Sequence, residues 1–463
     1  MIRLSWIDIL RSSYSSPSLT AAAAQNHMTS SNSSSKLTII IKRDLTCAFS
    51  SFLLLTFISS FFLIDFLHPF QYQYSQLSKV TGFFSQYLPS VSTKNNTRLY
   101  DQDQQQQQSP PPPGYCDYSV GRWVREEATA LRFYDEDCPF LDPGFRCRRC
   151  GRPDSEYLNW RWQPEYGCHL PRFNANDFLE RSRNGRVVFA GDSIGRNQWE
   201  SLICMLAQAV SNKSTIYEVN GNPVTKHKGF LCMRFAQYNL TVEYYRAPYL
   251  VVPARPPKNS PEAVKYAIRV DTLHWYSKSW AGADLLVFND GHWWNADKTI
   301  KQGFYFQEGE FVNMTMNVEE AFRRSLQTWK KWVMESLDSR KTHVVFRSYS
   351  PVHYRDGTWD VGGRCDTSFE PESNYTRMEE EPWNNKFIHE VVKQVEDGYN
   401  QVQFLNITYL AEFRIDAHPS KYREPGTPQP APQDCSHWCL PGVPDTWNEV
   451  LYANLLAKGF RAK

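Results

Sequence analysis

The sequence predicts an α/β fold: a parallel sheet covered by helices on both faces, with a cysteine-rich region before it and a membrane anchor at the N-terminus. Short apolar runs suited to buried strands alternate with segments of helical apolar spacing, which is the pattern of such a sheet. A charge-free run, Leu45–Ile64, predicts the anchor. The 463 residues include 51 basic and 49 acidic side chains, and this balance argues against a nucleic-acid-binding protein, which usually has a basic excess.

Strands and helices are expected in alternation from residue 186 onward. The expected strands are residues 186–190, 283–288, 342–347 and 402–407. The expected helices are residues 194–209, 317–337, 382–399 and 444–458. Asn317 is suited to cap the second of these helices, and Glu320 stands in the position of a capping box. Two hairpin-like stretches, 230–245 and 303–316, interrupt the alternation.

The run Leu45–Ile64 is long enough to cross a bilayer, since twenty helical residues span about 30 Å. Lys42 and Arg43 precede it, and the positive-inside rule then puts the N-terminus in the cytosol. A cleaved signal peptide is the competing interpretation, although its apolar region is usually shorter, about 7–15 residues. The organisation expected from this is a cytosolic tail (1–43), a transmembrane signal-anchor (44–67) and a Gln/Pro/Ser-rich stem (68–113).

Ten cysteines follow the anchor, an even number that indicates disulfides in an oxidising compartment. They are Cys116, Cys138, Cys147, Cys150, Cys168, Cys204, Cys232, Cys365, Cys435 and Cys439. Half of them fall in residues 114–180, which we expect to form a disulfide-stapled subdomain packed on a catalytic domain of residues 181–463. Cys147 and Cys150 form a CxxC pair, but no second pair follows at zinc-ribbon spacing, so no metal site is expected.

Acceptor triplets for N-glycosylation also indicate a lumenal position for everything after the anchor. These N-x-S/T triplets begin at Asn95, Asn212, Asn239, Asn313, Asn374 and Asn406. Together with the anchor, they predict a single-pass glycoprotein whose larger part lies in the lumen.

The first motif with chemical meaning is Gly191-Asp192-Ser193, between an expected strand and an expected helix. A serine there stands at the carboxyl end of a strand, where open α/β sheets bind ligands. The helix N-terminus adds backbone N–H groups that suit an oxyanion, and Ser193 itself is one such donor. Ser193 is therefore a candidate nucleophile. The alternative is that Ser193 only caps the helix.

The second motif is Asp434-Cys435-Ser436-His437. A serine nucleophile needs a base, and the base needs an orienting group. Asp and His three residues apart can face each other, so Asp434 is able to hold the ring of His437. The alternative is a surface aspartate and a hydrogen-bonded histidine. Because this irregular loop must be held still for catalysis, we expect Cys435 or Cys439 to be bridged to a distant partner such as Cys147 or Cys365.

The third motif is residues 289–294, directly after the expected strand 283–288 and therefore at the same edge of the sheet as Ser193. Asn289 is the candidate donor to an oxyanion. Several aromatic side chains are candidates for stacking on sugar rings, although for the first two a core position is equally expected. They are Trp160, Trp162, Trp293, Trp294 and Trp359. His353 and Arg355 are weaker candidates for acceptor contacts.

The chain resembles the plant trichome birefringence-like family, polysaccharide O-acetyltransferases with an SGNH/GDSL-type fold. The segments that carry the resemblance are CDYSVGRWV (116–124), CPF (138–140), GRPDSEYLNWRWQP (151–164), FAGDSIGRNQWESLICML (189–206), FNDGHWW (288–294), SPVHYRDGTWDVGGRC (350–365) and DCSHWCLPGVPDTWNEVLY (434–452). The resemblance implies Ser193 as nucleophile, His437 as base and Asp434 as orienting acid, and a type II anchor in the Golgi.

Two departures from the family pattern stand out. Relatives commonly have one cysteine before the GRPD segment, whereas this chain has Cys147 and Cys150. The usual Asn-Thr-Gly is here Asn289-Asp290-Gly291, which is nearer to the GxND block of GDSL hydrolases.

The expected reaction is transfer of an acetyl group to a cell-wall polysaccharide through an acetyl-serine, with an acetyl donor as co-substrate and no cofactor. Two other classes remain open: an acetylesterase that uses the same triad, and a non-catalytic protein that binds and bridges polysaccharides such as pectin. The triad speaks against the second of these. The sequence leaves the acceptor open among xylan, mannan, xyloglucan and pectin.

Overall fold

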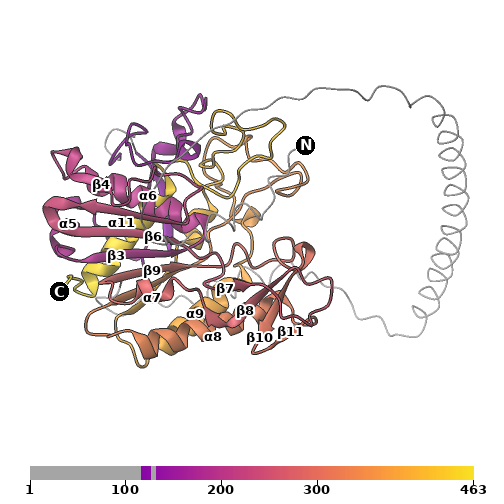
Figure 1. Cartoon of the computed structure of the whole chain (residues 1–463). Helices are drawn as coiled ribbons and strands as arrows, with labels where there is room; N and C mark the ends of the chain where they lie inside the picture. The colour runs from indigo at the N-terminus through magenta and orange to yellow at the C-terminus, as the bar shows by residue number, and fades with distance from the viewer. Residues whose placement is uncertain (1–115, 127–131) are drawn as a thin grey trace, which may run out of the picture. The chain divides into compact units, whose positions relative to one another are not determined.

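The computed structural model describes residues 116–126 and 132–463 (Figure 1). The expected cytosolic tail, signal-anchor and stem lie outside these residues. Within the described residues, no helix combines the length and the apolar character that a membrane span needs.

A seven-stranded sheet forms the centre of the fold (Figure 1). In spatial order its strands are β13 (Val402–Leu405), β12 (His343–Arg347), β9 (Leu285–Asn289), β3 (Arg186–Gly191), β6 (Leu240–Arg246), β5 (Phe230–Phe235) and β4 (Ile216–Glu218). The first five run parallel, whereas β5 is antiparallel to both of its neighbours. The sheet is therefore mixed, not parallel throughout as predicted, because the expected hairpin 230–245 joins it through β6.

Successive side chains of the central strands point to opposite faces, and each face has its own hydrophobic core. On β3, Val187 and Phe189 belong to one core and Val188 and Ala190 to the other. All four side chains are almost fully buried. This burial on both faces explains why the strand reads as a continuous apolar run instead of an alternating one.

Helices cover both faces of the sheet, as expected. They are α5 (Ala175–Arg181), α6 (Ser193–Ala207), α7 (Ser277–Trp280), α8 (Val318–Ser336), α9 (Trp383–Glu396), α10 (Thr408–Glu412) and α11 (Val443–Ala457). Helices α5, α6 and α11 pack on one face and α7, α8 and α9 on the other. The predicted cap is confirmed, since the Asn317 side chain accepts a hydrogen bond from Glu320 N at 2.8 Å.

A second, four-stranded sheet was not predicted. Its spatial order is β11 (Phe311–Asn313), β10 (Phe304–Glu308), β8 (Tyr266–Leu273) and β7 (Val251–Ala254). The expected hairpin 303–316 is present as the antiparallel pair β10 and β11. Strand β8 lies against α8, where the Thr328 hydroxyl donates to Val270 O at 2.6 Å.

The cysteine-rich region contains little regular structure apart from the antiparallel pair β1 (Gly121–Arg125) and β2 (Trp160–Pro164). Short 3₁₀ helices lie here and elsewhere at Pro143–Phe145, Glu156–Leu158, Lys213–Thr215, Ala236–Tyr238, Ile300–Gln302 and Tyr375–Arg377. Its buried side chains, among them Phe145 and Trp162, are part of the same core as α6 and α11.

The structure describes ten cysteines, and eight of them form disulfides. The pairs are Cys116–Cys168, Cys138–Cys204, Cys147–Cys439 and Cys365–Cys435. Cys150 and Cys232 are free thiols. The CxxC pair is therefore divided between a bridged and an unbridged cysteine, and the disulfides join the cysteine-rich region to α6 and to the segment that contains His437.

Candidate active site

Ser193 stands where the central strand β3 gives way to helix α6. Asp192, not Ser193, is the cap of this helix: its Oδ1 accepts hydrogen bonds from Ile194 N at 2.9 Å and Gly195 N at 3.4 Å. The backbone oxygen of Asp192 accepts from Arg196 N at 3.3 Å. The N–H of Ser193 is the one donor of this first turn that Asp192 does not occupy. The Ser193 hydroxyl is thus released from a capping role.

Glycine is required on both sides of Ser193 because Asn289, at the end of β9, packs against the strand-to-helix turn. A Cβ added at Gly191 would lie 2.1 Å from Asn289 Oδ1, and one added at Gly195 would lie 2.0 Å from the same atom. Asn289 Nδ2 donates to Asp192 Oδ1 at 2.6 Å. The amide expected to bind an oxyanion is therefore held on the Asp192 carboxylate, and only its second N–H is left for a substrate.

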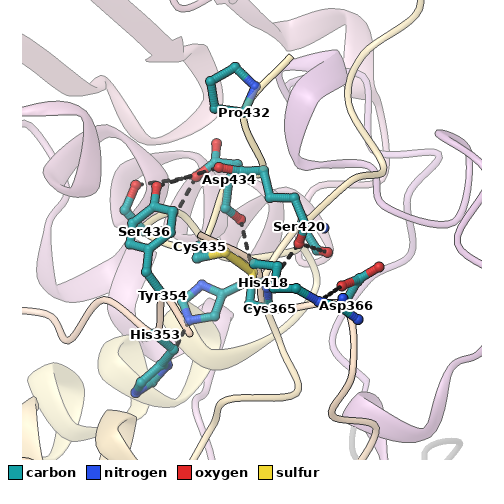
Figure 2. Close-up of a disulfide and its surroundings, with 12 residues drawn as sticks. His353, Tyr354, Cys365, Asp366, His418, Ser420, Pro432, Asp434, Cys435 and Ser436 are labelled. Carbon is teal, nitrogen blue, oxygen red and sulfur yellow. Dashed lines mark hydrogen bonds and ion pairs between the residues drawn. A yellow bond between two sulfur atoms is a disulfide. The ribbon is translucent and has the colours of Figure 1, made fainter. Parts of the chain in front are cut away.

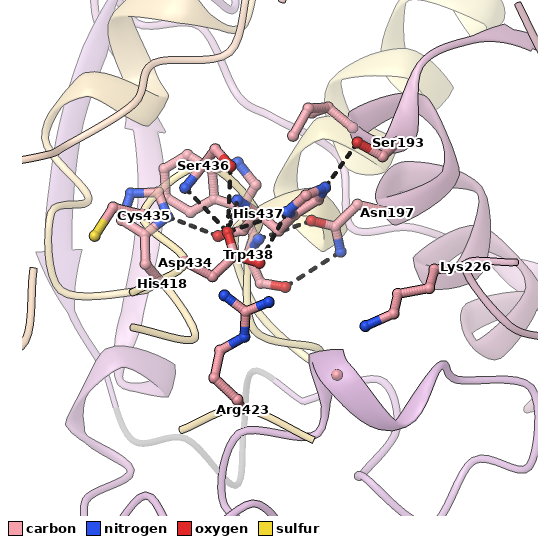
Figure 3. A network of polar contacts seen from close by, with 12 residues as sticks. Ser193, Asn197, Lys226, His418, Arg423, Asp434, Cys435, Ser436, His437 and Trp438 are labelled. Carbon is pink, nitrogen blue, oxygen red and sulfur yellow. Dashed lines mark hydrogen bonds and ion pairs between the residues drawn. The ribbon is translucent and has the colours of Figure 1, made fainter. Parts of the chain in front are cut away.

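The structure brings the three expected triad residues together (Figure 3). His437 Nε2 lies 2.8 Å from Ser193 Oγ, and His437 Nδ1 lies 3.0 Å from both carboxylate oxygens of Asp434. An ionised carboxylate only accepts, so Nδ1 carries the ring hydrogen and Nε2 is the basic nitrogen that faces the serine. This order of contacts is that of a serine nucleophile, a general base and an orienting acid.

Asp434 is held in its ionised form. Burial alone would raise the pKa of Asp434, but the charge of His437 and the hydrogen bonds from it lower this pKa far below its usual range. The carboxylate also accepts from His437 N at 3.1 Å and from Ser436 Oγ at 3.2 Å. It is therefore fixed from several directions, so it is able to hold the imidazole in one orientation.

The segment that contains Asp434 and His437 is neither helix nor strand, and two disulfides attach it to distant parts of the chain. Figure 2 shows the bridge between Cys365 and Cys435. Cys435 is bridged to Cys365, and Cys439 to Cys147. The prediction that Cys435 or Cys439 is bridged to a distant partner such as Cys147 or Cys365 is confirmed, and both of them are. The segment 434–440, which contains both bridged cysteines, is called the catalytic loop below.

Helix α6 also forms direct hydrogen bonds to the catalytic loop. Asn197, one turn after Ser193, accepts a hydrogen bond from Trp438 N at 2.8 Å and donates to Trp438 O at 3.2 Å. Because Trp438 follows His437, this pair of bonds sets the position of the base relative to the helix that begins with the nucleophile. Sequence reasoning did not select Asn197.

Two buried histidines lie behind the catalytic loop. His418 Nδ1 is 2.6 Å from His437 O, and His418 Nε2 is 2.7 Å from His353 Nδ1. Burial lowers the pKa of His418 well below its usual value, so its ring is neutral and Nδ1–H donates to the carbonyl. His353 is 6% exposed. The predicted contact of His353 with an acceptor is therefore wrong, because its ring is enclosed by protein.

The sequence matches two protein families over consecutive stretches. Residues 170–454 match the PC-Esterase family, described as a GDSL/SGNH-like acyl-esterase family found in Pmr5 and Cas1p. Residues 114–169 match the PMR5 N-terminal domain. The chain is 62% identical over 353 residues to trichome birefringence-like 9 of Arabidopsis thaliana, a match that covers 75% of this chain and 85% of that protein.

The chain belongs to the trichome birefringence-like family. Two further Arabidopsis thaliana members are trichome birefringence-like 6, with 43% identity over 74% of this chain and 71% of that protein, and trichome birefringence-like 7, with 41% identity over 73% and 72%. Membership supports an enzyme that transfers or hydrolyses acyl groups of plant polysaccharides, and the strand–GDS–helix geometry is consistent with the SGNH-like fold of the family match.

Two of the tryptophans expected to stack on sugars are core residues. Trp162 and Trp294 are each 1% exposed. Their indole N–H groups donate to Tyr118 O at 2.8 Å and to Asp290 Oδ1 at 2.9 Å. Asp290 of the unusual Asn-Asp-Gly segment thus holds the Trp294 ring, and burial raises the pKa of this carboxyl group well above its usual value. The binding role predicted for Trp294 is corrected, and for Trp162 the core position, which was equally expected, is the one observed.

The other candidates remain accessible. Trp160 and Trp293 are half-buried, and Trp359 is 38% exposed. Arg355 is exposed and lies 4.0 Å from a carboxylate oxygen of Glu372. Of these four, Trp293 is the one that follows a strand end at the same edge of the sheet as Ser193.

Two cavities lie apart from the triad. One, of about 310 Å³, is lined mainly by charged side chains of the cysteine-rich region together with Pro441. The second, of about 40 Å³, lies between the same region and the start of α11. No triad residue lines either of them. Both are lined by residues of the cysteine-rich region and by residues at or just before the start of α11.

Proposed function

We propose that this protein is an O-acetyltransferase of the Golgi membrane, which transfers acetyl groups to a cell-wall polysaccharide through an acetyl-serine at Ser193. The observation that carries the proposal is the contact chain from Ser193 through His437 to Asp434, with distances of 2.8 and 3.0 Å. The same contact chain argues against a protein that only binds and bridges polysaccharides.

In the first half-reaction, Ser193 Oγ attacks the carbonyl carbon of the acetyl donor while His437 Nε2 takes the hydroxyl proton. The tetrahedral oxyanion accepts a hydrogen bond from the backbone N–H of Ser193, at the N-terminus of α6. Asn289 offers the second N–H of its amide from the neighbouring strand end. Collapse breaks the bond to the leaving group, which receives the proton from His437.

In the second half-reaction, a hydroxyl group of the polysaccharide attacks the acetyl-serine. His437 takes the proton of that hydroxyl and returns it to Ser193 Oγ as the ester bond breaks. Water competes for the same intermediate. A bound sugar hydroxyl prevails only when it is positioned, and positioning supplies effective molarities of roughly 10⁵ M or more. Trp293 is the accessible aromatic side chain best placed to position the sugar.

An acetylesterase is the second candidate, and the match to an acyl-esterase family favours it. The two reactions differ only in whether water or a sugar hydroxyl attacks the acetyl-serine. Full-length protein incubated with a labelled acetyl donor and deacetylated wall polymers distinguishes them. We expect label on a polymer. Release of free acetate from acetylated polymer, with no gain of label on any polymer, would establish an esterase instead.

The cellular part of the proposal is a single-pass type II protein with its catalytic part in the Golgi lumen. Four disulfides are consistent with an oxidising compartment. Protease added outside sealed Golgi vesicles should leave the part after residue 67 intact, and glycosidase treatment should lower its mass. Loss of that part to the protease would reverse the proposed orientation.

A further inference from the structure

Three cations near the triad have no carboxylate partner among the described residues. Arg246, Lys298 and Arg423 form no contact of 4.0 Å or less with an acidic oxygen there. Each donates instead to a backbone carbonyl: Arg246 to Lys226 O at 3.5 Å, Lys298 to His292 O at 3.2 Å, and Arg423 to Pro432 O at 2.9 Å. Other basic side chains of the described part also lack such a partner, but these three lie near the triad.

The fold places two of these cations beside the nucleophile. Arg246 is the last residue of β6 and stands opposite Gly191 of β3 in the register of the parallel pair. The next residue of that strand end, Ala247, donates its N–H to Gly191 O at 2.7 Å. Lys298 interacts electrostatically with Asp192 and Asp434, the carboxylates on either side of Ser193.

Arg246 and Lys298 share one aromatic ring. The Trp293 ring centroid lies 5.6 Å from Arg246 Cζ and 5.2 Å from Lys298 Nζ. All three side chains are half-buried, which leaves them within reach of a ligand. An aromatic ring suits the apolar face of a sugar, while a guanidinium and an ammonium suit a carboxylate.

Arg246 and Lys298 are neighbouring cations that are both half-buried. Burial lowers the pKa of Lys298, as does the charge of Arg246, whereas the charges of Asp192, Asp434 and Asp297 raise it. An anion within hydrogen-bonding distance of both cations would offset their burial and their mutual repulsion. Arg423 points toward the Asp434 side of the catalytic loop and adds a third positive charge at the site (Figure 3).

We propose that Arg246, Trp293 and Lys298 form a subsite for a sugar that carries a carboxylate, so that the acceptor is a polymer containing uronic acid residues. The inference rests on the proposed acetyl transfer at Ser193. An anionic group could also arrive on the acetyl donor, and both would use the same cations. The acceptor is favoured because both cations lie over the Trp293 ring, so one sugar with a carboxylate would meet the aromatic side chain and the cations together.

The first test uses the unaltered full-length protein and p-nitrophenyl acetate, a donor without charge. The acceptors are an oligogalacturonide of defined length and the same oligosaccharide after reduction of its carboxyl groups. We expect kcat/KM for acetyl transfer to be about tenfold or more higher for the charged acceptor, the size of a charge-assisted hydrogen bond. Equal values for the two acceptors would overturn the proposal, while transfer to both would leave the proposed function intact.

The second test uses Arg246→Gln and Lys298→Gln, with Arg255→Gln and Lys278→Gln as controls, because Arg255 and Lys278 are exposed basic residues on other segments. Each variant of the subsite should lower kcat/KM about tenfold for the charged acceptor and less than about twofold for the reduced one. Lys298→Arg, which keeps the charge, should recover most of the loss.

The release of p-nitrophenol without an acceptor reports the acetylation of Ser193 and identifies variants that fail to fold. We expect this release to stay within about twofold of the unaltered protein in the controls Arg255→Gln and Lys278→Gln. For the subsite variants the quantity compared is the ratio of kcat/KM for the charged acceptor to that for the reduced one, in which any change in the acetylation of Ser193 cancels. Suppose that both variants slow the release of coenzyme A from acetyl-coenzyme A but not that of p-nitrophenol from p-nitrophenyl acetate, and use the two acceptors equally well. The anion would then belong to the donor, and the acceptor assignment would be wrong.

Discussion

The two halves of the active site are held in place by different means. Ser193 lies at the junction of a buried strand and a helix, with Asp192 as the cap and Asn289 packed against Gly191 and Gly195. Asp434 and His437 lie on a loop without regular structure. This loop is held by two disulfides and by hydrogen bonds from α6 and His418.

The difference separates what local sequence determines from what only the tertiary structure determines. The nucleophile depends on residues within a few positions of it, so its geometry follows once β3 and α6 form. The base depends on Cys147 and Cys365, which are 292 and 70 residues from their partners Cys439 and Cys435. We therefore expect the two halves to respond differently when a residue that supports them is substituted.

The largest effect should come from substituting the residues that react, because no neighbouring side chain can take over their chemistry. Ser193→Ala and His437→Ala should each lower the rate of acetyl transfer by about 10⁴-fold or more. Asp434→Ala should be the mildest of the three, since an orienting group is less essential than the nucleophile or the base. Transfer of labelled acetyl to polymer measures the rates.

His389→Ala, an exposed histidine on α9, is the matched control and should leave the rate unchanged. Unaltered thermal unfolding of the triad variants would show that the loss is chemical. Full activity of Ser193→Ala would remove the proposed mechanism.

The second effect tests the crosslinked half. Cys439→Ser removes the bridge two residues after His437, and a displacement of the base by about 1 Å is sufficient to lower kcat about 10²-fold. Cys116→Ser removes a bridge that lies entirely within the cysteine-rich region. Both variants should lose about 2–5 kcal/mol of stability. Only Cys439→Ser should also show the fall of about 10²-fold in kcat. The measurements are denaturant unfolding and steady-state kinetics on the same preparations.

An equal fall of kcat in the two cysteine variants would mean that the bridges act on global stability alone. In that case the distinction drawn between the halves would not hold for the base.

The third effect tests the regular half. Asp192→Ala removes the cap of α6 and the partner of Asn289, whereas Asn317→Ala removes the cap of α8, which is remote from the triad. Each should cost about 1 kcal/mol of stability, the usual value of a helix cap. Only Asp192→Ala should also lower kcat, by about tenfold, because the Ser193 N–H and hydroxyl move with the first turn. Asp192→Ser, which keeps a capping oxygen, should recover part of kcat.

The same division explains how far sequence reasoning reached. The strand before Ser193, the helix after it and the cap at Asn317 follow from local patterns, and the structure contains them. The spacing of Asp434 and His437, together with the resemblance, indicated the orienting acid and the base, and the need to fix their loop predicted a distant bridge from Cys435 or Cys439. The local pattern did err on one point, since it offered Ser193 as a helix cap where Asp192 takes that place.

The features that were missed depend on tertiary packing. A tryptophan suits a core and a binding surface equally, so the burial of Trp162 and Trp294 does not follow from their positions in the chain. Strand β6 pairs with β3 only in the assembled sheet, and this pairing is what brings Arg246 beside the nucleophile. His353 and His418 meet across 65 residues of sequence, which no local pattern indicates.

The smallest effect on kcat is expected for α11, the helix that follows the catalytic loop. Burial raises the pKa of Glu449 to about 7, against the charge of Arg172, which lowers it. The folded protein therefore keeps this proton up to about pH 7, while the unfolded chain releases it near pH 4.3. Between these values the folded state binds more protons, so stability should fall as the pH rises from 5 to 8, by about 1–3 kcal/mol.

Glu449→Gln should flatten this part of the pH profile, and Glu390→Gln, at an exposed position, should leave it unchanged. Because α11 begins immediately after the loop but lies outside the triad, kcat should not change in either variant. Denaturant unfolding at pH 5 and pH 8 measures the slope, and an unaltered slope in Glu449→Gln would assign the pH dependence to another buried carboxyl group.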